Sequence, residues 1–197
     1  MTRNPVGREG LRSARVQESA RMPVPLLRPG LLDGVDVLVA GDGALAAAAA
    51  GRAGELGAAV RRLEVDPLAE AVPQHSGEVS QLVWDGAGAF AAAGGGSVDA
   101  VRAALDGAWL AIRAVAPERA RKVVLLAPAP GDPHAEAARA GLENLARTLS
   151  IEWARFGVTL VAIAPGPETD PATVAELCAF LASPAGDYHS GSVIALA

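Results

Sequence analysis

The fold is decided by residues Lys122 to Gly166, which read KVVLLAPAPGDPHAEAARAGLENLARTLSIEWARFGVTLVAIAPG. Short apolar runs at 123–126 and 158–163 are typical of buried strands, and the second run leads to Pro165-Gly166. Between the runs, apolar residues recur at helical spacing: Leu142, Leu145, Leu149, Trp153 and Phe156. Strand, long helix (134–156) and strand in this order predict a parallel β-α-β unit.

The same alternation extends to both sides of this unit. Further strands are predicted by apolar runs at 35–40, 58–63, 81–84 and 192–196. Further helices are predicted at 44–56, 98–117 and 171–182. The pattern predicts a doubly wound parallel α/β sheet of about six strands, with helices on both faces.

The two long helices each show two kinds of apolar face. In the helix predicted at 98–117, large residues recur every three or four positions: Val98, Val101, Leu105, Trp109, Ile112 and Val115. We expect this stripe to pack on the sheet. A second face of the two helices consists of small residues that we expect to be exposed: Ala104, Ala108, Ala111, Ala137 and Gly141.

Composition and charge limit the classes of function. The chain has 197 residues, 51% of them hydrophobic, which suits one folded domain, predicted at 31–197. Residues 1–30 form an Arg-rich arm with six Arg and two Glu, hence a charge of +4, and the remainder carries −9 because the whole chain carries −5. This acidic body argues against nucleic acid as the main partner.

Compartment and metal binding are read from the same composition. No apolar run is long enough to cross a membrane, and the arm lacks the features of a targeting signal, so we expect a flexible arm and a cytoplasmic protein. Cys178 is the only cysteine, which excludes an internal disulfide. No Cys or His cluster has metal-ligand spacing, so no metal is expected.

Four segments together resemble the short-chain dehydrogenase/reductase family. Residues 122–166 resemble its catalytic half, and VLVAGDGALAAAAAG (37–51) is similar to its VLVTGxxxGIG turn. Asp85-Gly86-Ala87-Gly88 resembles its Asn-Asn-Ala-Gly, and DYHSGSVIALA (187–197) its YxTGxxIxVDGG. The chain also resembles the degenerate, flavodoxin-like amino-terminal domain of high-molecular-weight 3-oxoacyl-thioester reductases.

The resemblance also predicts the strand order. Only sixteen residues, Glu64 to Val79, separate the second strand from the third, too few for the helix, strand and helix that the family places there. Removing that outer strand from the family order 3-2-1-4-5-6-7 leaves, after renumbering, 2-1-3-4-5-6.

The family's reactive groups are missing from the matching positions. Its Asn, Ser, Tyr and Lys correspond to Ala104, Pro128, Ala135 and Arg139. Ala135 carries no proton to donate, and Arg139 keeps a positive charge but scarcely releases a proton near neutral pH. His134 is rotated by about 100° from the Tyr position on a helix and should point elsewhere. We therefore expect no catalytic residue.

The coenzyme site is equally incomplete. Of the turn glycines only Gly41 stands at a required position, while Leu45 and Ala47 occupy the other two. Asp42 should repel a pyrophosphate. Vestigial cofactor-binding positions are Gly41, Gly43, Asp85, Gly88, Arg139, Pro165 and Gly166. We expect no cofactor, and NAD or NADP is the open alternative.

These observations lead to one hypothesis and two alternatives. The resemblance implies a catalytically silent subunit that pairs through helices 98–117 and 134–156 with itself or with an active short-chain reductase of 3-oxoacyl-thioester type. The first alternative is an NAD(P)-dependent short-chain oxidoreductase with a rearranged active site. The second is a small-ligand or flavin-binding module, which rests on fold analogy alone.

Overall fold

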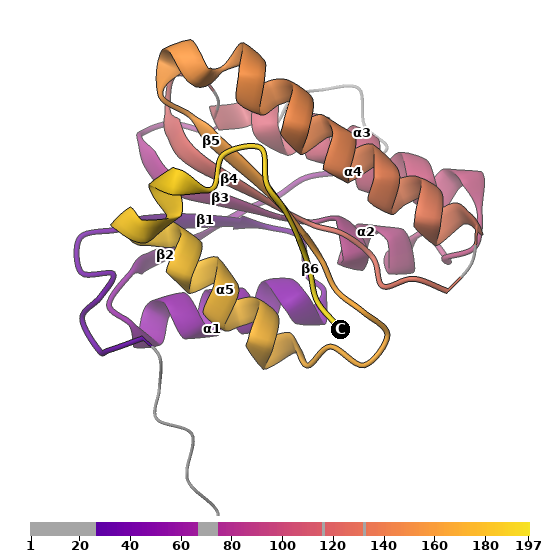
Figure 1. Cartoon of the computed structure of the whole chain (residues 1–197), viewed down its shortest axis with the longest axis horizontal. Helices are drawn as coiled ribbons and strands as arrows, with labels where there is room; N and C mark the ends of the chain where they lie inside the picture. The colour runs from indigo at the N-terminus through magenta and orange to yellow at the C-terminus, as the bar shows by residue number, and fades with distance from the viewer. Residues whose placement is uncertain (1–26, 67–74, 116, 132) are drawn as a thin grey trace, which may run out of the picture.

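The computed structural model describes residues 27–66, 75–115, 117–131 and 133–197. Its centre is a parallel sheet of six strands in the order β2-β1-β3-β4-β5-β6 (Figure 1). The strands are β1 (Asp36–Ala40), β2 (Ala59–Leu63), β3 (Val79–Asp85), β4 (Ala120–Leu126), β5 (Thr159–Ala164) and β6 (Val193–Ala195). The predicted α/β class and strand order are both confirmed.

The helices are α1 (Ala44–Glu55), α2 (Gly86–Ala92), α3 (Val98–Val115), α4 (Pro133–Glu152) and α5 (Pro171–Ala182). Two short 3-10 turns, η1 (Ala154–Phe156) and η2 (Pro184–Tyr188), complete the described elements. The predicted bounds of α5 are confirmed. The sequence did not predict α2, and it predicted that α4 extends to Phe156. In the structure α4 ends at Glu152 and is followed by η1. The C-cap of η1 is Gly157, which has φ +69°. Most of the predicted arm, residues 1–26, lies outside the described residues.

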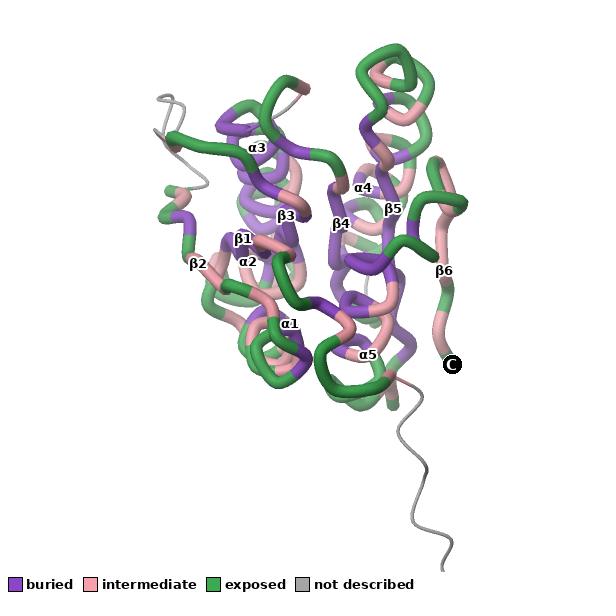
Figure 2. The backbone as a smooth tube through the Cα atoms, turned by 90° about the vertical axis from the view of Figure 1, so that its left-hand side faces the viewer, coloured by how far each residue is buried: buried purple, intermediate pink, exposed green. Residues whose placement is uncertain are grey.

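Two helix layers sandwich the sheet. Helices α1 and α5 pack on one face over inward-facing strand residues such as Val39, Val124 and Ile163. Helices α3 and α4 pack on the other face over neighbouring residues such as Leu82 and Leu125. Figure 2 shows the central strands buried between the two layers. This alternation of core contacts along each strand explains why the strands read as continuous apolar runs.

The expected orientation of α3 is wrong. Its small residues Ala104, Ala108 and Ala111 are fully buried, whereas Trp109 is 43% exposed and Val98 is 65% exposed. Of the predicted stripe, Ile112 and Val115 do reach the core. The small face therefore packs inward, and part of the large apolar face points to solvent.

The inward position of the small face has a steric cause. The indole of Trp84, on β3, is 1% exposed and donates from Nε1 to the carbonyl oxygen of Ala104 at 3.0 Å. Small residues on the inward face of α3 leave room for this indole to reach the helix backbone. The neighbouring helix uses Gly141 similarly, because a Cβ there would stand 2.7 Å from Cδ2 of Leu105. Gly141 serves packing within the chain, and Ala137 is exposed as expected.

None of the helices in the described parts of the chain combines the length and the apolar character that a membrane span requires.

Candidate functional site

The glycine-rich turn lies at the carboxyl ends of β1 and β3. Gly41 follows β1 with φ +108°, and Gly43 directly precedes α1. Asp85 ends β3 beside this turn and is fully buried. Parallel strands bring their carboxyl ends to one edge, which is where α/β sheets bind ligands. Four residues of the predicted vestigial coenzyme site, Gly41, Gly43, Asp85 and Gly88, lie together at this edge.

The Asp85 carboxylate is bound by backbone N–H groups of two helices. Its Oδ1 accepts the N–H of Gly88, in the first turn of α2, at 2.8 Å, and its Oδ2 accepts the N–H of Ala46, in the first turn of α1, at 3.3 Å. The backbone N–H of Gly43 also hydrogen-bonds to this side chain. Asp85 thus caps both helices, a role that the sequence reading, which compared it with an amide, did not foresee.

The glycines of the turn are explained by the proximity of Asp85. A Cβ on Gly43 would stand 2.4 Å from Oδ2 of Asp85, and a Cβ on Gly88 would stand 2.6 Å from the same oxygen. A Cβ on Gly41 would stand 2.8 Å from Cβ of Asp85. Each distance is shorter than atoms can approach, so these three glycines make room for an internal side chain.

Burial raises the pKa of Asp85, and the N–H groups of Gly88, Ala46 and Gly43 oppose that shift. The charge of Asp42 raises the same pKa further. Both oxygens accept N–H groups, which is the arrangement that suits the ionised form. Backbone N–H groups at the starts of α1 and α2 therefore hold the buried carboxyl group.

A dinucleotide does not fit this arrangement. Pyrophosphate binding at a strand-turn-helix unit uses backbone N–H groups at the start of the helix. Here N–H groups in that region already bond to Asp85, and a second anion would meet the charges of both Asp85 and Asp42.

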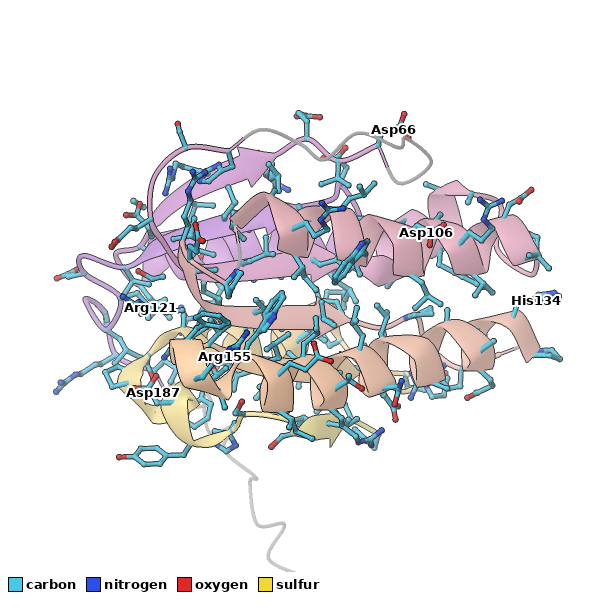
Figure 3. The ribbon with its side chains drawn as sticks, turned by 90° about the horizontal axis from the view of Figure 1, so that it is seen from above. Asp66, Asp106, Arg121, His134, Arg155 and Asp187 are labelled. Atoms are coloured by element: carbon cyan, nitrogen blue, oxygen red, sulfur yellow. The ribbon has the colours of Figure 1, made fainter. Side chains whose placement is uncertain are left out.

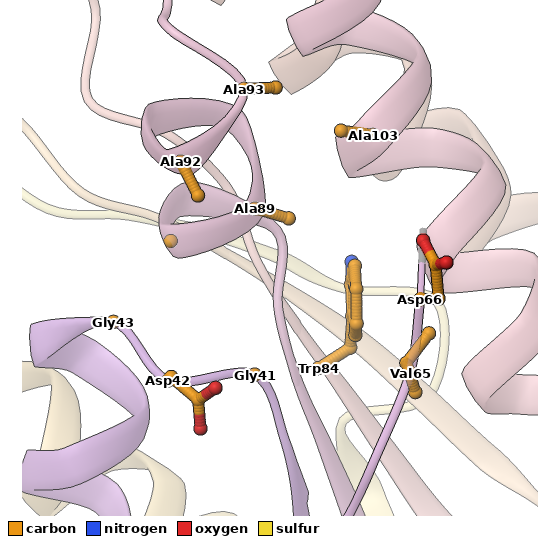
Figure 4. A pocket seen from close by; sticks show the side chains of 11 residues that line it. Gly41, Asp42, Gly43, Val65, Asp66, Trp84, Ala89, Ala92, Ala93 and Ala103 are labelled. Atoms are coloured by element: carbon orange, nitrogen blue, oxygen red, sulfur yellow. The ribbon is translucent and has the colours of Figure 1, made fainter. Parts of the chain in front are cut away.

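A cavity of about 450 Å³ opens beside the turn. Figure 4 shows it between the turn, the end of β2 and helices α2 and α3. Most of its wall is apolar, with Trp84, Val65 and small residues of α2 such as Ala89, while Asp42 and Asp66 supply carboxylates. Basic side chains are absent from this lining of described residues.

The positions that match the family's Asn and Tyr are sealed in a hydrophobic cluster. Ala104 is fully buried and Ala135 is 3% exposed. Both belong to one cluster with Phe90, Ala100 and Ala138. Phe90 comes from α2, which explains why sequence reasoning did not anticipate the cluster. None of these five side chains can donate, accept or transfer a proton.

Arg139, at the family's Lys position, binds the backbone. Its Nη1 donates to the carbonyl oxygens of Pro128 and Pro165, each at 2.7 Å, and its Nε lies 3.8 Å from Oε2 of Glu136. These bonds join the loops that follow β4 and β5. The guanidinium therefore acts as a structural link between two loops of the expected active site.

The Pro165-Gly166 turn is packed from inside the chain. The N–H of Gly166 donates to Oγ1 of Thr169 at 2.8 Å, and Thr169 in turn donates to the carbonyl oxygen of Ala197 at 2.9 Å. A Cβ on Gly166 would stand 2.6 Å from the carbonyl carbon of Ala197. Helix α5 follows almost at once, with Asp170 accepting the N–H of Ala172 at 2.9 Å as its N-cap.

The histidines lie apart from this site. Figure 3 shows His134 at the amino-terminal end of α4. The ring of His189 packs on Phe180 with centroids 5.5 Å apart, and the carbonyl of His75 accepts a bond from Arg119. Within the described segments no three His, Cys, Asp or Glu residues gather as metal ligands would. Cys178 is buried, and burial raises the pKa of its thiol to about 12.

A second hollow runs along the outer surface between α3 and α4. It has a volume of about 290 Å³ and is lined by Leu105, Trp109, Gly141, Asn144, Leu145 and Thr148. We call it the α3/α4 groove. Its exposed Trp109 and half-buried Leu105 and Leu145 make it partly apolar. The two helices that the sequence predicted as contact helices thus share one exposed, partly apolar surface. Its side chains are larger than the small residues that the sequence predicted there.

No protein-family model and no curated protein matches the sequence. Solved structures match it in fold. Citronellol catabolism dehydrogenase (AtuB) of Pseudomonas aeruginosa PAO1 has a TM-score of 0.68 and 24% identity, over 87% of this chain and 96% of that one. A short chain dehydrogenase from Mycobacterium smegmatis has a TM-score of 0.68 and 22% identity, over 89% and 96%. BdcA in complex with NADPH has a TM-score of 0.66 and 19% identity, over 84% and 94%. The chain therefore has the fold of short-chain dehydrogenases.

Proposed function

We propose that this chain is a catalytically silent member of the short-chain dehydrogenase/reductase family that acts by assembly. Its partner is a second reductase-like subunit, either its own copy or an active short-chain reductase of 3-oxoacyl-thioester type. Contact is made through α3 and α4. The subunit stabilises or regulates the assembly, and hydride transfer takes place elsewhere.

The observation that carries the proposal is the sealed cluster at the reaction centre. A ketone reductase must place a substrate carbonyl beside a proton donor. Ala104 and Ala135 offer no proton, and the side chain of Phe90 packs against them. Arg139, the one charged residue among the four matching positions, directs Nη1 to two backbone carbonyls. Loss of the donor and filling of its space together support a silent subunit.

The α3/α4 groove supports assembly. An exposed Trp is unusual on a monomer and is enriched at contact surfaces. Trp109 is 43% exposed, and Leu105 and Leu145 continue the apolar surface around it. A pair of helices with a groove between them fits a matching helix pair of a similar subunit by ridges into grooves.

The experiment measures the mass of the full chain by sedimentation, alone and mixed with a co-encoded short-chain reductase. We expect a dimer or a mixed oligomer, which Trp109→Glu converts to monomers. Tyr188→Ser is the matched control, because Tyr188 is 89% exposed but lies outside the groove. The proposal would be wrong if the wild-type chain is monomeric and if mixing it with the reductase changes neither the sedimenting mass nor the activity of that enzyme.

The alternative is an NAD(P)-dependent oxidoreductase with a rearranged active site. It is favoured by the fold shared with a protein solved with NADPH. It requires saturable binding of NADPH or NADH in a calorimetric titration and turnover that Arg139→Ala abolishes. If the chain bound coenzyme without turnover, it would be a coenzyme-binding subunit that is not an oxidoreductase. If it showed neither binding nor turnover, the proposal of assembly would stand against this alternative.

A further inference from the structure

The cavity of about 450 Å³ beside the glycine turn changes character from its inner end to its rim. Trp84, which is 1% exposed, closes the inner end, and the half-buried Val65 belongs to the same wall. Asp42 and Asp66 are both exposed and also line the cavity (Figure 4). The cavity therefore runs from an apolar interior to a rim that carries two carboxylates.

Small side chains keep this space open. Ala89, Ala92 and Ala93, from α2 and the residue after it, and Ala103 of α3 line the cavity with methyl groups alone. Protein interiors are normally filled to the density of organic crystals, and larger side chains at these positions would fill the space. The volume lies within the range of small-molecule pockets, about 300 to 1,000 Å³. A ligand with one aromatic ring and a short chain would fit it.

The charges around the cavity favour a cation. Its lining of described residues holds two carboxylates and no Arg, Lys or His. Arg62 lies close to the turn, but its Nη1 donates to the carbonyl oxygen of Gly41 at 3.0 Å, and it is not part of that lining. A dinucleotide would bring negative phosphates beside Asp42, whereas an ammonium group would be attracted to the carboxylates.

We propose that this cavity binds a small amphipathic cation of the arylalkylammonium class. The hydrocarbon body lies between Trp84 and the alanines of α2 and α3, where burial of apolar surface stabilises it. The ammonium group lies at the rim beside Asp42 and Asp66. The ligand thus has the opposite charge to the family's coenzyme. Its binding does not depend on assembly through α3 and α4.

The test is calorimetric titration of the full chain with three probes of similar shape: benzylammonium chloride, neutral benzyl alcohol and the anion phenylacetate, at equal ionic strength. We expect saturable binding of benzylammonium, binding of the alcohol that is weaker by about fivefold or more, and the weakest binding for phenylacetate. Asp42→Asn and Asp66→Asn should each weaken benzylammonium binding by about fivefold. Glu168→Gln is the matched control, because it removes an exposed carboxylate outside the cavity.

A second variant tests where the ligand lies. Ala92 is an exposed residue of α2 that lines the cavity, so Ala92→Leu should take up part of the volume and weaken benzylammonium binding. A thermal melt of each variant checks that it is folded.

The inference is wrong if benzylammonium gives no saturable heat or if benzyl alcohol binds as tightly as the ammonium ion. It is also wrong if Glu168→Gln weakens binding as much as Asp42→Asn and Asp66→Asn do, or if Ala92→Leu binds as the wild type does. A chain that sediments as a monomer, changes no reductase and still binds benzylammonium would contradict the assembly proposal and support this inference.

Discussion

The indole Nε1 of Trp84 donates a hydrogen bond to the carbonyl oxygen of Ala104 at 3.0 Å. This bond ties β3 to α3 at the position where the short-chain reductase resemblance expected a catalytic Asn. Ala104 lies on the buried face of α3, whereas Trp109 and Val98 of the same helix are exposed to solvent. The contact with this strand side chain is therefore made by the face of α3 that is hidden from solvent.

Trp84→Phe should lower the free energy of unfolding by about 1 to 3 kcal/mol, because a buried carbonyl loses its donor and the core loses volume. Urea denaturation measures the change. Trp109→Phe is the control on the exposed helix face and should change the free energy by less than about 0.5 kcal/mol in the monomer. Equal effects of the two substitutions would contradict the assigned role of Trp84.

Ala135→Tyr restores the family's acid in sequence but should restore no activity. Ala135 is 3% exposed and packs with Phe90, so a Tyr ring overfills the cluster and destabilises the fold by about 1 to 3 kcal/mol or more. Thermal unfolding and NADPH oxidation with a 3-oxoacyl thioester are the measurements. Ala137→Tyr, at an exposed position of the same helix, should leave stability nearly unchanged. Turnover by Ala135→Tyr would refute the sealed centre.

Arg139→Ala should destabilise the chain by about 1.5 to 3 kcal/mol, because charge-assisted bonds to the carbonyls of Pro128 and Pro165 are lost. Hydrogen exchange should rise in the loops after β4 and β5. Arg139→Lys should restore part of the loss, since an ammonium can still donate to a carbonyl. If Arg139→Ala changed coenzyme binding and left stability intact, the oxidoreductase alternative would gain.

The raised pKa of Asp85 predicts a pH effect with a definite sign. Burial is its main cause, so the folded state binds the proton more tightly than the unfolded state, whose Asp titrates near 3.9. This contribution to stability is complete below the unfolded pKa and is lost as pH rises through the folded pKa. The wild-type advantage over Asp85→Asn should therefore shrink with rising pH across that window. Denaturant unfolding at several pH values measures it, and an advantage that grows with pH would contradict the shift.

Cys178 should resist thiol reagents in the native state. Burial raises its pKa to about 12, and the thiolate is the reactive species. Ellman's reagent at pH 8 should therefore label the chain only after denaturant unfolds it. Rapid labelling of the folded chain would contradict the burial of α5 against the sheet.

The sequence by itself determined the sheet and most helix bounds, and the family resemblance added the strand order. Continuous apolar strands such as Val123–Leu126 and the helical spacing of Leu142 and Leu149 are local signals, and both kinds are buried as expected. Aligning the sequence with the family's catalytic motif was enough to show that Ala135 stands in place of the Tyr. The short link from Glu64 to Val79 excluded the outer strand by length alone.

Only the tertiary structure decided how faces and charges are used. Both faces of α3 are apolar, so periodicity could not tell that Ala104 and Ala108 lie inward and Trp109 outward; the space between α3 and Trp84 settled it. The partners of the Asp85 carboxylate include an N–H from Ala46, 39 residues away along the chain. Such contacts depend on where parallel strands end in space, and no local pattern records that.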